Sequence, residues 1–356
     1  MRPKRLPTIQ DVACHAGVSI TTVSHILHGK RHLYTEKTIK KVEDASQELH
    51  YHPNSLARSL ARRRSYTLGV VIRKLPTSEL DMHLGCILSG IFEQTTHYNY
   101  QVKLIPWQGE TWEALVPTLE DASIDGALLF LTQLSSPLLD WARHTHLPCV
   151  AIGSLSEQEP LSSVDVDNEG ALYDATRWLI SLGHRRIGYI RGEAGHSDTP
   201  LREQGYRRAF REAGLPADPT WTCDGDYTRE AGVQGVSRLL DACPTLTALL
   251  CPTDRAAIGA MEALQKRGLR VPQEISVVGF NDREVAQYVQ PPLTTIHKPV
   301  AEIGQKAAEL LIRQIESDTQ APVRLVLSAP LIQRASVAPV LSAEDQPLLP
   351  TGQRNG

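Results

Sequence analysis

Residues 17–19, Gly-Val-Ser, separate two short segments whose apolar residues recur at helical spacing. The glycine supplies the geometry of a tight turn, and the serine hydroxyl can cap the helix that follows. In such a helix-turn-helix, the exposed residues at the start of the second helix can hydrogen-bond to base edges in the major groove of DNA. A helical hairpin in any small bundle is the alternative. The exposed candidates are Ile20, Thr21 and His25.

Short helices with marked boundaries are predicted to hold this turn in place. Thr8 can cap the first helix, and Asp11 completes a capping box with it. Thr35 opens the third helix. Pro53 fits the first turn of a fourth helix over residues 53–61, and a polar connector follows it.

The charge of the chain is unevenly distributed. Residues 1–65 hold twelve Lys and Arg against five Asp and Glu, whereas the other 291 residues hold 25 against 35. A basic head on an acidic body predicts a polyanionic partner for the head alone. This imbalance favours double-stranded DNA over the bundle alternative.

Several classes of protein are disfavoured by composition. The six cysteines are scattered without a CxxC pair, which is typical of reduced thiols, so we expect no metal site and no cofactor. The basic N-terminus lacks the apolar segment of a secretory signal. No run of about 18 uncharged apolar residues exists that could span a membrane. We therefore expect a cytoplasmic protein without a membrane partner.

From residue 67 onward, short apolar runs alternate with amphipathic stretches. This alternation predicts an α/β body of two doubly wound lobes behind the small all-α head, with a ligand cleft outside the carboxyl ends of the strands. We expect a helix-turn-helix domain at 1–52, a hinge helix and linker at 53–66, the body at 67–340 and a disordered tail at 341–356. The predicted strands are 68–72, 102–105, 127–130, 149–152, 187–190, 248–251 and 275–279, and the predicted helices of the body are 168–182, 201–213 and 254–267.

An enzyme and a transport-type binding protein are alternative functions for such a body. The sequence contains no GxSxG, HExxH or GxxxxGK[ST] motif. His184 follows a predicted helix end, where it is expected to satisfy backbone groups rather than to catalyse a reaction. The attached basic head argues against a transport protein, so we expect neither alternative.

The chain resembles the LacI/GalR family of bacterial repressors over about residues 8 to 335. In the head the resemblance rests on TIQDVA at 8–13, AGVS at 16–19, TVS at 22–24 and YHPNSLARSL at 51–60. In the body it rests on DG at 125–126, LGHRRI at 182–187, Arg202 with GY at 205–206, GF at 279–280 and PLTTI at 292–296. The resemblance implies a transcriptional regulator, expected to be a repressor, whose affinity for its operator is controlled by a carbohydrate-like effector.

For the head, the resemblance implies base reading by the start of the second helix. The family commonly has arginine at the position of His25, and a histidine lacks the bidentate fork that arginine offers to guanine. Leu60 matches a leucine that the family's hinge helix inserts into the minor groove, a plain core leucine being the alternative. The implied DNA-binding residues are Thr8, Ser19, Ile20, Thr21, Thr22, Ser24, His25, Asn54, Ala57 and Leu60.

For the body, the resemblance implies two lobes like those of periplasmic sugar-binding proteins, closing over a small effector. Arg202 matches the family's effector-gripping arginine. Tyr227 falls where the family places an aromatic platform, although ordinary core packing explains it nearly as well. Asn281 stands where the family usually has aspartate. The implied effector-binding residues are Arg73, Gly153, Arg202, Tyr227, Thr253 and Asn281.

Three of these positions depart from the family pattern. Arg73 replaces a residue that is usually small and polar, and Gly153 and Asn281 stand where some or most members have an acid. Together they favour a negatively charged effector such as a sugar phosphate, with a solvated Arg73 at the cleft mouth as the alternative. A homodimer on a palindromic operator is also expected, since one short reading helix covers too few base pairs for specificity.

Overall fold

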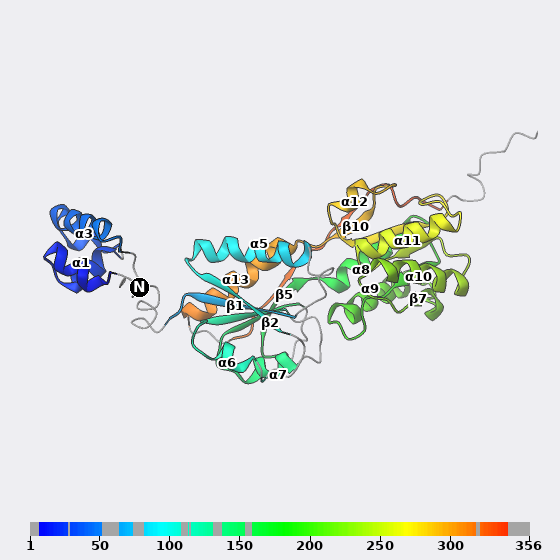
Figure 1. The fold of residues 1–356 in the computed structure, drawn as a ribbon. Coiled ribbons are helices and arrows are strands. Elements are labelled where there is room, and N and C mark those ends of the chain that lie inside the picture. Colours follow the sequence, from blue (N-terminus) through cyan, green and yellow to red (C-terminus); the bar gives the residue numbers. More distant parts are fainter. Residues whose placement is uncertain are drawn as a thin grey trace, which may run out of the picture. The chain divides into compact units, whose positions relative to one another are not determined.

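The computed structural model describes residues 7–27, 29–51, 64–73, 82–107, 113, 115–130, 137–153, 159–317 and 321–340. They belong to two separate compact units, Met1–Tyr66 and Thr67–Gly356 (Figure 1). The predicted hinge helix at 53–61 and the predicted tail at 341–356 lie outside the described residues. No helix in the described ranges is long and apolar enough to cross a membrane.

The head consists of α1 (Ile9–Ala16), α2 (Ile20–Leu27), the short 3-10 helix η1 (Arg31–Leu33) and α3 (Glu36–Glu48). Its core is apolar, and Val12, Val23 and Val42 are fully buried in it. The expected capping box is present, since Thr8 N donates to Asp11 Oδ2 at 2.7 Å and Asp11 N donates to Thr8 Oγ1 at 3.3 Å.

The turn between α1 and α2 also has the predicted geometry. Gly17 adopts a left-handed conformation with φ of 64°, which a side chain would disfavour. Ser19 then accepts a hydrogen bond from Thr22 N at 3.1 Å and caps α2. Thr35 caps α3 in the same way, with Thr38 N at 3.4 Å. The local boundary marks in the sequence are therefore confirmed.

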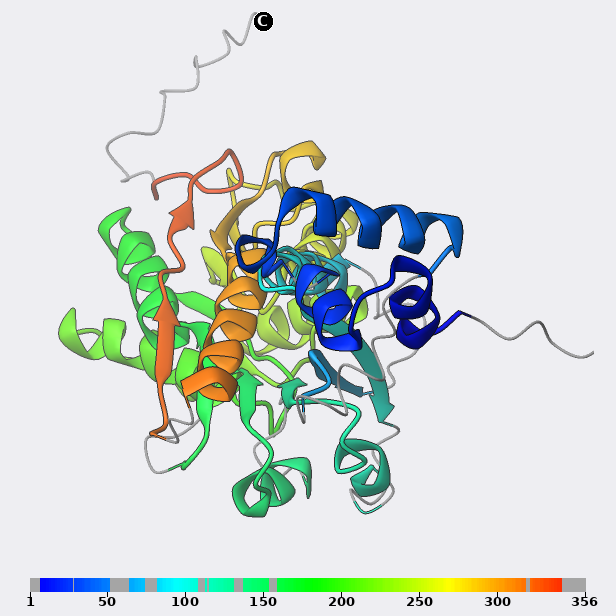
Figure 2. The ribbon, with the colours of Figure 1, turned by 90° about the vertical axis from the view of Figure 1, so that its left-hand side faces the viewer.

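The first lobe of the body is built on a six-stranded parallel sheet in the order β11-β5-β4-β3-β1-β2. Helices α5 and α13 pack side by side on one face, and α6 and α7 cover the other (Figures 1 and 2). The strands are β1 (Thr67–Arg73), β2 (Gln101–Trp107), β3 (Gly126–Phe130), β4 (Cys149–Ile152), β5 (Ser162–Val166) and β11 (Arg324–Leu327), and the helices are α5 (Met82–His97), α6 (Val116–Leu119), α7 (Pro137–His144) and α13 (Val300–Ser317).

The second lobe holds a sheet in the order β12-β10-β9-β8-β6-β7, in which only β12 runs antiparallel to its neighbour. The strands are β6 (Ile187–Ile190), β7 (Thr222–Cys223), β8 (Ala248–Leu250), β9 (Ser276–Asn281), β10 (Thr294–His297) and β12 (Leu331–Ile332). The helices are α8 (Asn168–Ser181), α9 (Asp198–Glu212), α10 (Arg229–Ala242), α11 (Asp254–Lys266) and α12 (Val285–Tyr288), with the 3-10 helix η3 (Pro219–Trp221) before β7.

The chain passes between the two lobes three times, after β5, after β10 and after β11. The two predicted doubly wound lobes are confirmed, and all seven predicted apolar runs form strands. Strands β5, β7, β10, β11 and β12 were not predicted. In β5 and β10, polar residues interrupt the apolar pattern. Asp165 on β5 and Thr294 and Thr295 on β10 are nevertheless buried. Polar side chains are buried at low cost only where they find hydrogen-bond partners.

Candidate DNA-reading face and effector site

Helix α2 divides its residues between the core and the surface. Val23 and Ile26 are buried, whereas Ile20 and Thr21 are exposed and His25 is half-buried. Thr21 and His25 are four residues apart and therefore share one face of the helix. The structure thus places Thr21 and His25, two of the three predicted base-reading residues, on one accessible face of α2.

Other predicted DNA-contacting residues serve the head as caps. The hydroxyl groups of Ser19 and Thr22 lie 2.8 Å apart at the start of α2, and the Thr8 hydroxyl belongs to the capping box of α1. Ser24 is half-buried. Asn54, Ala57 and Leu60 lie outside the described residues, so their proposed roles rest on the resemblance alone.

His25 has a partner that the sequence analysis missed. Its Nδ1 lies 2.9 Å from the hydroxyl of Tyr34, which follows η1. The two residues are nine positions apart and belong to different elements, so helical periodicity gives no sign of this contact.

In the body, Arg202 on α9 is the centre of a buried polar cluster. Its Nε donates to Asn168 Oδ1 at 2.9 Å, its Nη1 donates to the carbonyl oxygen of Pro252 at 3.0 Å, and its Nη2 pairs with Asp198 at 2.7 Å. The guanidinium carbon lies 3.6 Å from the ring centroid of Phe280. With 3% exposure, this arginine is held by protein groups on every nitrogen.

Asp198 is charged although its side chain is only 16% exposed. Burial opposes its ionisation, but the positive charges of Arg202 and Lys298 and a hydrogen bond from Tyr227 outweigh it and hold the pKa of Asp198 below its ordinary value. Tyr227 Oη donates this bond at 2.7 Å. The same contact and burial of the phenol raise the pKa of Tyr227, so its hydroxyl stays protonated.

The cluster continues into the first lobe. Asn168, at the start of α8, donates from Nδ2 to Asp165 Oδ2 at 2.9 Å, and Lys298 pairs with Asp165 at 2.9 Å. Asp165 belongs to β5 of the first lobe, whereas Arg202 and Tyr227 belong to the second. A continuous polar chain therefore joins the two lobes, and the sequence analysis identified only its Arg202 and Tyr227.

Thr253 lies beside this chain but also has a structural task. Its hydroxyl donates to the carbonyl oxygen of Tyr227 at 3.0 Å and accepts from Ala256 N at 3.1 Å, which caps α11. Arg202 contacts the neighbouring Pro252. The structure thus brings Arg202 on α9 close to Tyr227 and Thr253, which lie in the segments that follow β7 and β8.

Asn281 ends β9, and a strained backbone segment begins there. Asn281 and Asp282 have φ of 104° and 53°, and such left-handed backbone is uncommon for residues other than glycine. The loop is held by side chains on both sides. Asp254 accepts from Arg283 N at 2.6 Å, and Asp282 pairs with Arg334 at 2.6 Å.

Asp254 itself is buried and also contacts the hydroxyl of Thr295. Burial raises its pKa from 3.8 to about 6, although the hydrogen bonds from Thr295 and Arg283 act in the opposite direction. A carboxyl group that supports the backbone beside Asn281 therefore titrates above its usual range.

The two remaining predicted effector residues lie at strand ends of the first lobe. Gly153 follows β4 with φ of 139°, and its backbone N donates to Val164 O at 3.1 Å. Arg73 ends β1, but its side chain lies outside the described part of the chain. The predicted contact of Arg73 with the effector therefore stays a prediction. Within the described cluster, Arg202 and Lys298 each have a carboxylate partner.

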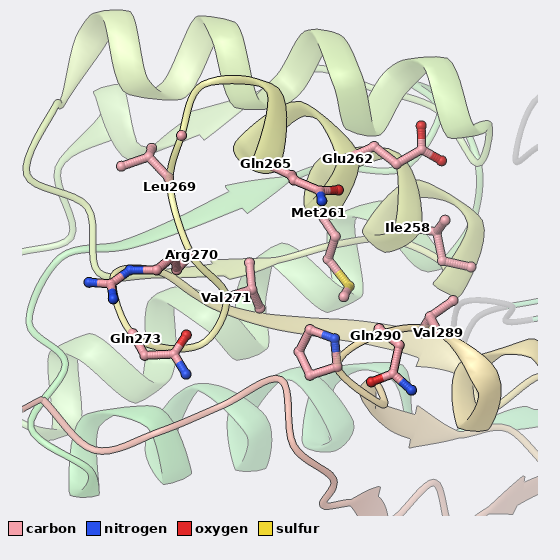
Figure 3. A pocket seen from close by; sticks show the side chains of 12 residues that line it. Ile258, Met261, Glu262, Gln265, Leu269, Arg270, Val271, Gln273, Val289 and Gln290 are labelled. Carbon is pink, nitrogen blue, oxygen red and sulfur yellow. The ribbon is translucent and has the colours of Figure 1, made fainter.

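Two pockets among the described residues lie elsewhere. One of about 580 Å³ is lined by α11 and the segments 268–273 and 289–291, including Ile258, Met261 and Val289 (Figure 3). A second is lined by α8 and residues 326–331. None of the predicted effector residues lines either pocket. No group of three or more His, Cys, Asp or Glu that could hold a metal ion occurs in the described ranges.

Comparison with known families gives one match for the head and one for the body. Residues 8–54 match bacterial regulatory proteins of the lacI family, and residues 176–337 match the periplasmic binding protein-like domain. The chain is 34% identical to the HTH-type transcriptional regulator CelR of Thermobifida fusca, over 94% of this chain and 100% of that protein. It is 32% identical to the ribose operon repressor of Haemophilus influenzae, over 93% and 99%.

Solved structures give the same picture. A complex of the transcriptional regulator CelR with cellobiose superposes with a TM-score of 0.72 and 33% identity, covering 93% of this chain and 99% of that one. The lac repressor dimer bound to operator and the anti-inducer ONPF superposes with a TM-score of 0.82 and 27% identity, covering 94% and 100%.

Proposed function

The chain belongs to the LacI family of bacterial regulatory proteins, and we propose that it is a homodimeric transcriptional repressor whose affinity for a palindromic operator is set by a carbohydrate effector. The observation that carries this proposal is the pairing of two features in one chain. The head presents Thr21 and His25 on one accessible helix face, and the body joins its lobes through the polar cluster of Arg202.

The effector is proposed to be a sugar or a sugar phosphate. The cluster offers carboxylate, amide, phenol and guanidinium groups, which are the partners that sugar hydroxyls use. CelR was solved with cellobiose, and another relative is a ribose operon repressor. The proposed contacts come from Arg73, Gly153, Arg202, Tyr227, Thr253 and Asn281.

Dimer formation is supported by a structural relative. The lac repressor structure, which covers 94% of this chain, is a dimer bound to its operator. Two reading helices related by a two-fold axis would read a palindrome.

The compartment and the absence of catalysis are part of the same proposal. A regulator acts where the chromosomal DNA is, which in bacteria is the cytoplasm. The relatives are transcriptional regulators rather than enzymes. We propose that ligand binding, and no chemical reaction, links the body to the head.

Residues 53–61 are proposed to form a hinge helix, with Leu60 inserted into the minor groove. Leu60→Ala is expected to weaken specific binding and reduce DNA bending while ligand affinity stays unchanged, because an inserted apolar side chain stabilises an unstacked step. Circular-permutation gels measure the bend. An unchanged bend would make Leu60 an ordinary core residue.

A gel shift with genomic fragments, followed by a titration with sugars and sugar phosphates, tests the whole proposal. The expected result is a retarded fragment whose affinity changes with one ligand, and the same ligand raises the melting temperature of the body. Retention of no fragment, or turnover of a sugar, would contradict the proposed function.

A further inference from the structure

The recognition helix carries a histidine whose ring is held on one side only. Tyr34 Oη lies 2.9 Å from His25 Nδ1, and the two ring centroids are 6.1 Å apart at an interplanar angle of 52°. Among the described residues, no second group hydrogen-bonds the His25 ring. Nδ1 is therefore occupied within the protein, and Nε2 is left for a ligand on the face that His25 shares with Thr21.

Tyr34 is placed by the head itself rather than by His25. Its side chain is half-buried and packs against the apolar core of the head. Its backbone N donates to Arg31 O at 3.0 Å, and the next residue, Thr35, caps α3. The Tyr34 hydroxyl is therefore held in place independently of His25 and can orient the His25 ring.

The direction of the hydrogen bond follows from the chemistry of the two groups. A phenol O–H is a better donor than an imidazole N–H, and an unprotonated ring nitrogen is a better acceptor than a phenol oxygen. With the Tyr34 hydroxyl as the donor to Nδ1, the proton of the neutral ring sits on Nε2. We propose that Tyr34 is a positioning residue that presents His25 to the major groove as an Nε2–H donor.

If α2 binds the major groove as proposed, this tautomer limits the bases that His25 can contact. An N–H donor requires an acceptor, which guanine offers at N7 and O6, adenine at N7 and thymine at O4, whereas cytosine presents an amino donor. The base contacted by His25 is therefore expected to be guanine, adenine or thymine, with cytosine rejected. One neutral hydrogen bond corresponds to a preference of roughly three- to tenfold.

The first test uses the full-length protein. An operator is selected from randomised duplex DNA, and the base pair contacted by His25 is identified as the one whose substitution no longer matters in His25→Ala. Wild type is expected to bind the cytosine variant of that site roughly three- to tenfold more weakly. In Tyr34→Phe the ring can take either tautomer, so this ratio should fall toward one while binding to unrelated DNA stays unchanged.

A matched control removes a tyrosine hydroxyl from another part of the molecule. Tyr173 on α8 of the body donates to Glu212 at 2.6 Å, and Tyr173→Phe should keep the wild-type base ratio. Tyr34→Phe combined with His25→Ala should show no further loss of base preference beyond His25→Ala alone, because Tyr34 acts only through His25.

The second test reads the tautomer directly. Nitrogen NMR of the wild-type protein with labelled histidine is expected to place the neutral His25 proton on Nε2, and a proton on Nδ1 would overturn the inference. This measurement uses the wild-type protein, so it tests the inference even where Tyr34→Phe lowers the melting temperature of the head. Selection of no operator by wild type would contradict the proposed function itself. A wild-type base ratio in a folded Tyr34→Phe would contradict only the role of Tyr34.

Discussion

The head and the body hold their polar recognition groups in opposite ways. On α2, Thr21 is exposed and His25 is held by a single hydrogen bond. In the body, Arg202 is almost fully buried, and each of its nitrogens already has an acceptor on the protein. The head therefore presents groups that await a partner, whereas the body presents groups that a ligand must share or displace.

In the head, the residues proposed to recognise DNA contribute little to folding stability. In the body, the residues proposed for recognition also stabilise the fold. An exposed side chain on a capped helix can change with little effect on folding. A buried charge that loses its partner leaves an uncompensated charge in a medium of low dielectric constant. Specificity for DNA is thus free to vary in the head, while the effector cluster of the body is constrained by its own packing.

The largest expected effect tests the coupling in the body. Arg202→Met should lower the free energy of unfolding of the body by about 3–5 kcal/mol, because it leaves Asp198 buried without its guanidinium partner. Urea denaturation of the full chain measures this loss. On the same helix, Arg207 pairs with Glu203 at the surface, and Arg207→Met should cost no more than about 1 kcal/mol. Equal losses in both variants would remove the contrast between buried and exposed groups.

The second effect is a dependence of the stability of the body on pH. Because the pKa of Asp254 is raised from 3.8 to about 6, the folded body binds this proton more tightly than the unfolded chain. The resulting stabilisation is complete below about pH 4 and is lost as the pH rises through about 6, and it amounts to roughly 3 kcal/mol.

Asp254→Asn is the variant that measures this effect. It removes the titrating group but keeps a side chain that can accept the hydrogen bond from Arg283 N. Between pH 4 and pH 7, wild type should lose stability relative to Asp254→Asn. A constant difference between the two proteins would show that Asp254 keeps an ordinary pKa.

The third effect concerns the ligand rather than the fold. If Arg73 contributes to an anionic grip, Arg73→Ala should weaken a phosphorylated sugar roughly tenfold while hardly changing its neutral parent, because a charge-assisted hydrogen bond is lost. Calorimetry with matched pairs of sugar and sugar phosphate gives the answer. Since Arg202 and Lys298 both have carboxylate partners, Arg73 would supply the added positive charge. A preference of wild type for the neutral sugar would place Arg73 outside the site.

The smallest effect tests the independence of the head. Thr35→Ala removes the hydroxyl that accepts from Thr38 N at the start of α3, which costs about 1 kcal/mol in a typical helix. The unfolding transition of the head should move by that amount, and that of the body should stay in place. Calorimetry of the full chain separates the two transitions. A matching shift of the body would mean that the two units do not unfold independently.

The head was largely predictable because its determinants are local. Thr8 with Asp11, Gly17 and Thr35 act within three or four positions of their own place in the chain, and the structure confirms each boundary. The exception is Tyr34, whose hydroxyl meets His25 across a turn. No local pattern marks that contact.

In the body, apolar runs predicted the strands that consist mainly of buried hydrophobic residues. They did not predict β5 or β10, because Asp165 and Thr295 are buried through hydrogen bonds and ion pairs with distant partners. Helices α5 and α13 were also not predicted. Gly90 on α5 lies against Ala301 of α13, with no room for a Cβ atom, so the packing of these two helices depends on a close approach that one segment alone cannot reveal.

By itself, the sequence determined where the elements begin and end, which residues face the core, and which face of α2 is accessible, since these follow from caps, turns and periodicity along the chain. Only the tertiary structure decided which polar groups meet. Asp165, Asn168, Asp198, Arg202 and Lys298 come from four different elements or crossings. Their pairing depends on the two passages of the chain between the lobes that follow β5 and β10, and burial of a charge is favourable only once its partner has been brought there.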